Sequence, residues 1–184
     1  MNRRLMLTSS LCTGLCAAWT RAEAALEVGD RAPDFSAQAA LGGKVFRYSL
    51  AEALARGPVV LYFFPAAFSE GCSLEAHEFA EASPQFAEAG ASIAGVSADD
   101  IETLTQFSVK ACQSRFAVVS DEAHGVIKAF DTAMHTRPDY ANRVSYVIAP
   151  GGTIAQVYAS LNPMRHVDRT LAAVREIAAA SVRR

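Results

Sequence analysis

A cysteine follows the most apolar segment of the chain, at the end of a short turn. Residues 59–64 (VVLYFF) are strand-forming and apolar, and the turn after them carries Pro65, Ser69 and Cys72. We predict that a helix begins near Cys72, so that the positive end of the helix dipole favours a thiolate there. The Ser69 hydroxyl is placed to donate a hydrogen bond to the same sulfur. A thiolate is the nucleophilic form of cysteine, so a reactive sulfur is the first functional hypothesis, with a buried, inert thiol as its alternative.

The elements that must position this turn alternate between strands and helices. The pattern predicts a hairpin from two strands, a buried strand at 59–64, and further strands over 92–96, 118–119, 144–148 and 153–158; the hairpin strands are 35–39 and 45–48. Helices are predicted over 49–56, from about 72 to 90 with a new segment at Ser83 and Pro84, from 99 or 100 to 111, over 122–130 and over 164–178. Residues 132–142 are predicted to be a polar loop. This order predicts the α/β class and a thioredoxin-like fold, with an N-terminal β-hairpin and a central mixed sheet flanked by helices.

Composition favours one folded domain after an N-terminal signal. The 184 residues are 51% hydrophobic and 20% charged, with a net charge of −2. No basic cluster is present, so we expect no nucleic-acid partner. Arg3 and Arg4 precede a short apolar run at 5–19, and residues 22–24 (AEA) fit a signal-peptidase site.

Residues 1–24 are therefore predicted to be a cleaved secretory signal, and residues 25–184 one mature domain that is free of the membrane. The apolar run contains several polar residues and is shorter than the roughly 20 residues that a membrane anchor needs. We expect export to the periplasm by the general secretory or the twin-arginine route, with cleavage near Ala24.

Cleavage would leave two cysteines, Cys72 and Cys112, with 14 basic and 18 acidic residues. A disulfide-stapled scaffold is excluded, and the question becomes whether the two thiols form a redox pair. The four histidines are scattered without metal-ligand spacing and are predicted to lie at the surface, so we expect neither metal nor cofactor.

The turn resembles the active-site segment of the peroxiredoxins, P-x-x-x-T/S-x-x-C, with serine where threonine is more common. Further landmarks follow in the order of that family: APDF at 32–35, CSLEA at 72–76, GVS at 95–97, SD at 120–121 and RVSYVI at 143–148. The resemblance covers about residues 26–180 and is nearest to the Q-type, or bacterioferritin-comigratory, members of the AhpC/TSA superfamily. It implies a thiol-dependent peroxidase that reduces hydrogen peroxide and small organic hydroperoxides through a cysteine sulfenic acid.

The resemblance also implies a role for each site residue. Arg143 heads a predicted strand whose start lies near Cys72 in a thioredoxin-like sheet, and its non-titrating fork suits both a sulfur and a peroxide oxygen. The Cys72 thiolate would attack one oxygen while Ser69, Arg143 and backbone N–H groups stabilise charge on the departing one. Pro65 would limit solvent access, and Glu75 would support Arg143.

The second half of the cycle depends on Cys112. Many Q-type members carry the resolving cysteine five residues after the first, where this chain has His77. Cys112 lies 40 residues after Cys72, in a region where other members place it. On a helix it falls about 20° from Ile101, at the edge of the apolar face. An intramolecular disulfide after local unfolding and a one-cysteine mechanism with an external thiol both remain open.

Other functions fit the same fold. A thiol-disulfide oxidoreductase is disfavoured because Glu75 stands where its second cysteine would be, and a copper carrier because Ala76 replaces a ligand. A redox sensor or binding module that oxidises without turnover is the non-enzymatic alternative. We expect a peroxide substrate, a thioredoxin-like dithiol or small thiol as reductant, and a monomer or weak homodimer.

Overall fold

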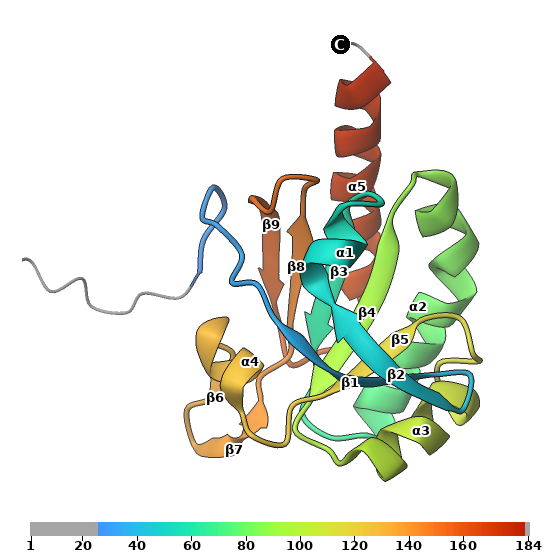
Figure 1. Cartoon of the computed structure of the whole chain (residues 1–184), viewed down its shortest axis with the longest axis vertical. Coiled ribbons are helices and arrows are strands. Elements are labelled where there is room, and N and C mark those ends of the chain that lie inside the picture. Colours follow the sequence, from blue (N-terminus) through green and yellow to red (C-terminus); the bar gives the residue numbers. More distant parts are fainter. Residues whose placement is uncertain (1–25, 183–184) are drawn as a thin grey trace, which may run out of the picture.

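The apolar run after Gly57 forms β3 (Val59–Phe63), an inner strand whose residues are all buried. In the computed structural model, which describes residues 26–182, β3 belongs to a seven-stranded sheet in the order β2-β1-β5-β4-β3-β8-β9 (Figure 1). The other strands are β1 (Ser36–Leu41), β2 (Lys44–Ser49), β4 (Ser92–Ser97), β5 (Ala117–Ser120), β8 (Val144–Ile148) and β9 (Ile154–Ala159).

The sheet has a parallel centre with antiparallel pairs on either side. Strands β3, β4 and β5 are parallel, whereas β8 runs antiparallel to β3 and to β9, and the hairpin β1–β2 pairs antiparallel with β5. The predicted thioredoxin-like fold, with its N-terminal hairpin and mixed sheet, is therefore confirmed. The predicted signal at residues 1–24 lies outside the described residues.

Helices cover both faces of the sheet because side chains of a strand alternate in direction. Val60 and Tyr62 join one hydrophobic cluster beneath α2, α3 and α5, while Leu61 and Phe63 join a second cluster with α1 and α4. The helices are α1 (Leu50–Leu54), α2 (Glu70–Glu88), α3 (Ile101–Lys110), α4 (Gly125–Ala129) and α5 (His166–Val182). Helix α5 packs against α2 and projects beyond the sheet (Figure 1). Within residues 26–182, no helix is long and apolar enough to span a membrane.

Helix α2 runs unbroken through Pro84, although a new segment was predicted to begin there. A proline inside a helix cannot donate to the carbonyl four residues earlier, which here belongs to Ala80. The Ser83 hydroxyl donates to that carbonyl instead, at 2.8 Å. The side chain that resembled a helix cap thus satisfies the acceptor that the proline leaves free.

The stretch after β5 also differs from the prediction. Residues 132–142 form a small antiparallel sheet of β6 (Ala133–Met134) and β7 (Arg137–Ala141) instead of a polar loop. Helix α4 begins at Gly125, three residues later than predicted, because the Asp121 carboxylate accepts hydrogen bonds from the backbone N–H groups of Gly125 and Ile127. The residue before the helix, His124, is its N-cap residue and has a left-handed backbone conformation, with φ of 57°.

Candidate functional site: a buried thiol and guanidinium

The candidate nucleophile lies where the chain leaves β3 and enters α2. Cys72 is the third residue of α2 and is 1% exposed. It therefore belongs to the first turn, where backbone N–H groups lack helical partners and negative charge is stabilised. The sequence placed the helix start near Cys72, and the structure places it two residues earlier, so the sulfur lies deeper within that turn.

Arg143 directly precedes β8, the strand that pairs with β3, and its side chain reaches the Cys72 sulfur from there. In the β3–β8 register, Phe63 pairs with Val144, so the residue before β8 lies beside the end of β3. Arg143 Nη2 donates to Cys72 Sγ at 3.3 Å, and its Nε donates to the Leu161 carbonyl at 3.1 Å. Arg143 is 5% exposed, so the guanidinium charge faces the sulfur in a largely water-free setting.

Gly71 leaves the room that this contact needs. A Cβ at Gly71 would lie 3.2 Å from Arg143 Nη2, which is tighter than ordinary van der Waals contact. The residue before Cys72 is therefore small because the guanidinium crosses over it. A glycine in a turn has an ordinary conformational explanation, so the sequence alone gives no sign of this steric role.

Glu75 lies one helical turn after Cys72 on the same face, and its carboxylate completes a buried ion pair. Arg143 Nη1 donates to Glu75 Oε2, and Glu75 has no exposed surface. Burial raises the pKa of Glu75 to about 8, although the guanidinium of Arg143 opposes that shift. The contact predicted between Glu75 and Arg143 is present.

His166 also belongs to this cluster, contrary to the prediction that it lies at the surface. Its side chain is fully buried; Nε2 lies 3.0 Å from the Ser160 carbonyl, and Nδ1 lies 2.8 Å from Ser145 Oγ and 3.4 Å from Glu75 Oε1. A carbonyl only accepts, so Nε2 carries the proton and Nδ1 accepts from Ser145 in the neutral ring. Burial lowers the pKa of His166 and favours that neutral form. The sequence signal for this burial was the four-residue spacing of His166, Thr170 and Val174, which places all three on one face of α5. All three are buried.

The turn before Cys72 is held by Asp99, one of the two residues at which the sequence predicted that a helix begins. Asp99 Oδ2 accepts from the backbone N–H of Ala67 at 2.7 Å and from the Ser97 hydroxyl at 2.8 Å. The neighbouring Asp100 is the actual N-cap of α3. Asp100 therefore caps α3, whereas its neighbour Asp99 holds the turn before Cys72.

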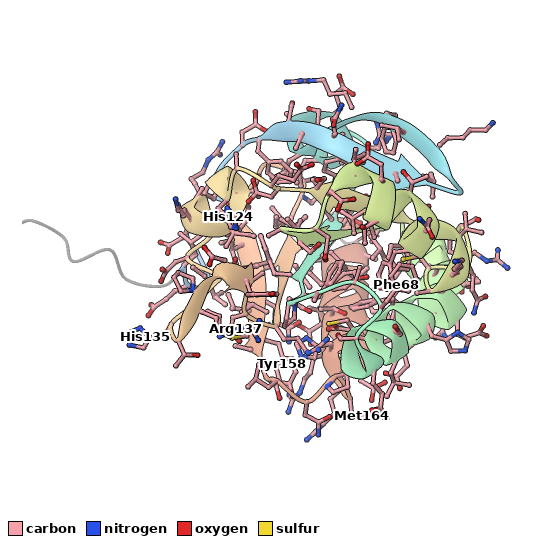
Figure 2. The ribbon with its side chains drawn as sticks, turned by 90° about the horizontal axis from the view of Figure 1, so that it is seen from below. Phe68, His124, His135, Arg137, Tyr158 and Met164 are labelled. Atoms are coloured by element: carbon pink, nitrogen blue, oxygen red, sulfur yellow. The ribbon has the colours of Figure 1, made fainter. Side chains whose placement is uncertain are left out.

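Ser69 does not make the contact predicted for it. It is the N-cap residue of α2 and is exposed, and its hydroxyl donates to the Ala66 carbonyl at 3.0 Å. A serine hydroxyl has one proton to donate, so this arrangement leaves none for Cys72. Pro65 is half-buried and lies two residues after the end of β3, in the turn predicted to hold it. Phe68, at the tip, is left-handed and exposed at the surface seen in Figure 2, with its ring edge against Phe107.

Cys112 is a buried free thiol, as is Cys72, and the two belong to the same hydrophobic cluster. Helix α3 ends at Lys110, so Cys112 lies in the turn after it and not within the helix as predicted. Burial raises the pKa of Cys112. Burial also raises the pKa of Tyr62, and charge on either sulfur raises it further, so this ring lies within electrostatic reach of both thiols.

A thiol under a guanidinium at a helix N-terminus, on a thioredoxin-like sheet, defines a class of cysteine-based redox proteins. More particularly, residues 28–157 match the AhpC/TSA family, and the chain belongs to that family. Within residues 26–182, no group of three or more His, Cys, Asp or Glu side chains is arranged to hold a metal ion.

Individual relatives agree with the Q-type resemblance. The chain is 33% identical to chloroplastic peroxiredoxin Q of Sedum lineare over 115 residues, which are 62% of this chain and 61% of that protein. It is 30% identical to peroxiredoxin Bcp of Xanthomonas campestris pv. campestris over 123 residues, which are 64% of this chain and 76% of that protein. The match thus spans about three fifths of the length of the Sedum protein.

Solved structures show the same similarity. Peroxidoxin BcpB from Mycobacterium tuberculosis superposes with a TM-score of 0.75 at 28% identity, over 83% of this chain and 98% of that one. Peroxiredoxin Q from Xanthomonas campestris superposes with a TM-score of 0.67 at 29% identity, over 77% and 90% of the two chains.

Proposed function

We propose that this protein is a thiol-dependent peroxidase that reduces hydrogen peroxide and small organic hydroperoxides. The observation that carries the proposal is the 3.3 Å contact between Arg143 Nη2 and Cys72 Sγ, formed between two buried groups at the N-terminus of α2. A cation fixed at this distance favours the thiolate over the thiol, and the thiolate is the form that attacks a peroxide. Membership of the AhpC/TSA family supports the same chemistry.

The reaction begins as a displacement at oxygen. The Cys72 thiolate attacks one oxygen of ROOH, a sulfur–oxygen bond forms, and the O–O bond breaks. The departing RO⁻ takes a proton from solvent and leaves as ROH, while Cys72 becomes a sulfenic acid. As the reaction consumes the negative charge on the sulfur, the Arg143 guanidinium stabilises the charge that develops on the departing oxygen.

Cys72 is almost fully covered, and in our proposal peroxide reaches the sulfur through the turn that precedes it. In this turn Pro65 is half-buried and Ser69 is exposed. In our proposal Pro65 limits the entry of water, and the Ser69 hydroxyl turns from the Ala66 carbonyl to the peroxide when substrate enters. Glu75 keeps the guanidinium oriented by holding Nη1, which leaves Nη2 for the reacting atoms.

The return half of the cycle uses Cys112 in this proposal. Its thiol condenses with the Cys72 sulfenic acid, giving a disulfide and one water, and a thioredoxin-like dithiol or small thiol then reduces the disulfide. Because Cys112 is fully buried in the turn after α3, that turn must open before the two sulfurs meet. The alternative is a one-cysteine cycle in which an external thiol attacks the sulfenic acid directly.

Intact-mass measurement after one equivalent of peroxide tests both halves. Wild type is expected to lose about 2 Da as the disulfide forms, whereas Cys112→Ser gains about 16 Da as trapped sulfenic acid. Cys72→Ser is expected to keep its mass. A gain of about 16 Da in wild type with no disulfide supports the one-cysteine cycle, and oxidation of Cys72→Ser at the wild-type rate overturns the proposal.

We also propose that the protein is exported to the periplasm and that it is a monomer or weak homodimer. The support for export is in the sequence: Arg3 and Arg4, the apolar run that follows, and the small-x-small site at residues 22–24. Fractionation followed by N-terminal sequencing tests this proposal, with Ala25 expected as the first residue of the periplasmic form. A cytoplasmic protein that retains residues 1–24 overturns it. Light scattering gives the oligomeric state.

A further inference from the structure

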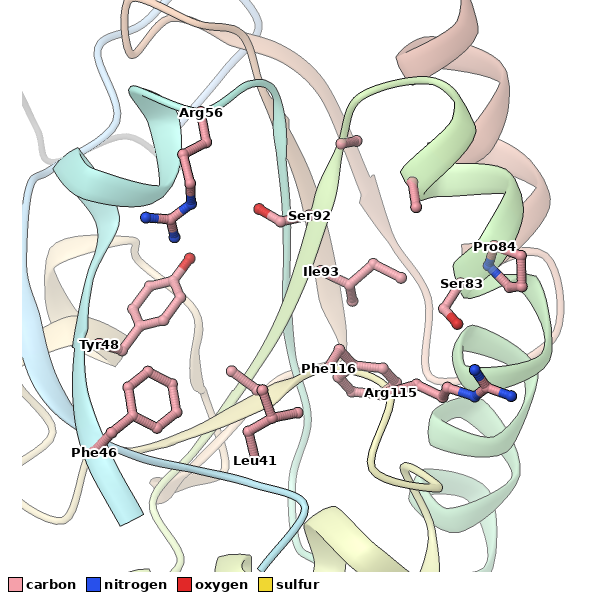
Figure 3. Close-up of a pocket in the computed structure, with 13 residues that line it drawn as sticks. Leu41, Phe46, Tyr48, Arg56, Ser83, Pro84, Ser92, Ile93, Arg115 and Phe116 are labelled. Carbon is pink, nitrogen blue, oxygen red and sulfur yellow. The ribbon is translucent and has the colours of Figure 1, made fainter. Parts of the chain in front are cut away.

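A pocket of about 540 Å³ lies between the second half of α2, the starts of β4 and β5, and the N-terminal hairpin (Figure 3). Its volume falls within the range of about 300–1,000 Å³ that is typical of small-molecule sites. The buried side chains of Ile93 and Phe116 form its apolar wall, and the partly exposed Leu41 and Phe46 form its rim.

This pocket is separate from the site at Cys72. Pro84 lines the pocket and lies 12 residues after Cys72 on the continuous helix α2. At about 1.5 Å per residue, the two positions are about 18 Å apart along the helix axis. None of the residues that surround the sulfur lines the pocket, so it takes no part in peroxide chemistry.

A buried hydroxyl at this pocket has no hydrogen-bond partner. Tyr48 is 7% exposed, and among residues 26–182 no protein group pairs with its hydroxyl. The side chain lines the pocket, and in Figure 3 the hydroxyl points along it toward Arg56 and Ser92. Burial raises the pKa of Tyr48, so the hydroxyl keeps its proton and is a donor. An unpaired buried donor lowers the stability of the folded protein, and a ligand with an acceptor would recover that loss.

The charge around the pocket has one sign. Arg56 and Arg115 both line it, and no acidic residue does. The ion pairs found in the described part of the chain are confined to the Glu75 cluster, so neither arginine is neutralised by a carboxylate within 4.0 Å. Figure 3 shows the Arg56 guanidinium extending toward the Tyr48 hydroxyl. An arginine fork beside a hydroxyl donor matches the geometry of a carboxylate.

We propose that this pocket binds a small organic monocarboxylate with an apolar body, through Arg56 and Tyr48 at its polar end and Ile93 and Phe116 along its wall. The carboxylate oxygens accept hydrogen bonds from the guanidinium and from the hydroxyl. The apolar body covers the wall between α2 and β4, and Arg115 adds a second positive charge. A neutral molecule of the same shape would leave both arginines unpaired.

Calorimetric titration of the purified full chain with octanoate tests this site, with octanol as the uncharged probe. Octanoate is expected to bind, and octanol to bind at least about tenfold more weakly. Arg56→Gln is expected to weaken octanoate binding by about tenfold. The matched control is Arg47→Gln, since Arg47 is exposed on β2 between Phe46 and Tyr48 and does not line the pocket.

Tyr48→Phe separates a ligand site from a structural role. Because the hydroxyl lacks a partner, its removal is expected to leave the free protein equally or more resistant to urea while weakening octanoate binding. Cys72 reactivity toward peroxide is expected to be the same in all these variants. The site is overturned if octanoate does not bind, if octanol binds equally well, or if Arg56→Gln and Arg47→Gln bind octanoate alike.

Discussion

Arg143 and Cys72 are 71 residues apart in the chain, yet Arg143 Nη2 lies 3.3 Å from Cys72 Sγ. Two features of the fold cause this contact. Antiparallel pairing of β8 with β3 brings the start of β8 to the end of β3, and Gly71 leaves space for the guanidinium over the first turn of α2. The contact therefore depends on the sheet register and on one missing Cβ as well as on the two reacting groups.

Arg143→Gln is expected to slow the reaction of Cys72 with peroxide by about a hundredfold to a thousandfold, because the thiolate and the departing oxygen both lose their cation. Arg143→Lys is expected to recover part of the rate, since it keeps the charge but cannot hold Glu75 and the sulfur together. The measurement is the rate of sulfenic acid formation, trapped with dimedone. Arg47→Gln, on the exposed face of β2, is the control and should react as wild type does.

Gly71→Ala is expected to lower the same rate by roughly tenfold, because the new Cβ displaces Arg143 Nη2 and small displacements in an active site are costly. Alanine favours a helix over glycine, so the urea stability of this variant should not fall in proportion. Gly125→Ala at the start of α4 is the matched control, since its nearest neighbour would lie 3.9 Å from the new Cβ. Equal peroxide rates for the two variants would refute the crowding argument.

Glu75 and His166 are expected to give opposite pH dependences of folding stability. Burial raises the pKa of Glu75 to about 8, so the folded state takes up a proton that the unfolded chain, with a carboxyl pKa near 4.3, does not. That stabilisation is complete at low pH and is lost as the pH rises through 8. Burial lowers the pKa of His166, so its contribution is present above about pH 6.5 and is lost as the pH falls.

Urea unfolding between pH 8 and pH 5, followed by circular dichroism, measures these contributions. On acidification, Glu75→Gln should lose stability relative to wild type, because it lacks the proton uptake of the folded state. His166→Asn should gain stability relative to wild type over the same interval, because its unfolded state no longer takes up a proton at this position. Parallel curves for wild type and both variants would contradict the pKa shifts.

Cys112 is expected to react slowly with iodoacetamide in native buffer, since it is fully buried and burial raises the pKa of its thiol. The Cys72→Ser variant isolates this reaction, and peptide mass mapping locates the label. Urea concentrations below the unfolding transition should accelerate labelling if the turn after α3 opens locally. Labelling at the rate of the unfolded chain without urea would show that this turn is already open.

The fold could be predicted because its strongest signals are local. The unbroken apolar run at β3, the turn residues of the hairpin and the periodicity of α5 each indicate one element, and their order indicates the sheet. Cys72, Arg143 and Glu75 could be predicted as neighbours because the family pattern encodes the strand pairing. The resemblance to Q-type peroxiredoxins agrees with the relatives found.

What the sequence did not show depends on single hydrogen bonds between distant or competing groups. The Ser83 hydroxyl decides that α2 continues past Pro84, and the Ala66 carbonyl takes the only proton of Ser69. The spacing of His166 relative to Val174 places this histidine on the apolar side of α5, but it does not identify Ser145 as the partner of the ring. Each of these outcomes requires knowing which acceptor lies within reach, and spacing along the chain does not supply that.

The central claim, that Cys72 is the sulfur that reduces peroxide, is tested most directly by peroxide consumption in excess dithiothreitol. Wild type is expected to turn over many equivalents of hydrogen peroxide, and Cys72→Ser to consume none above the rate of the thiol alone. Cys112→Ser should retain the first turnover, since the reacting pair of Cys72 and Arg143 is intact. Consumption by Cys72→Ser at the wild-type rate would contradict the account.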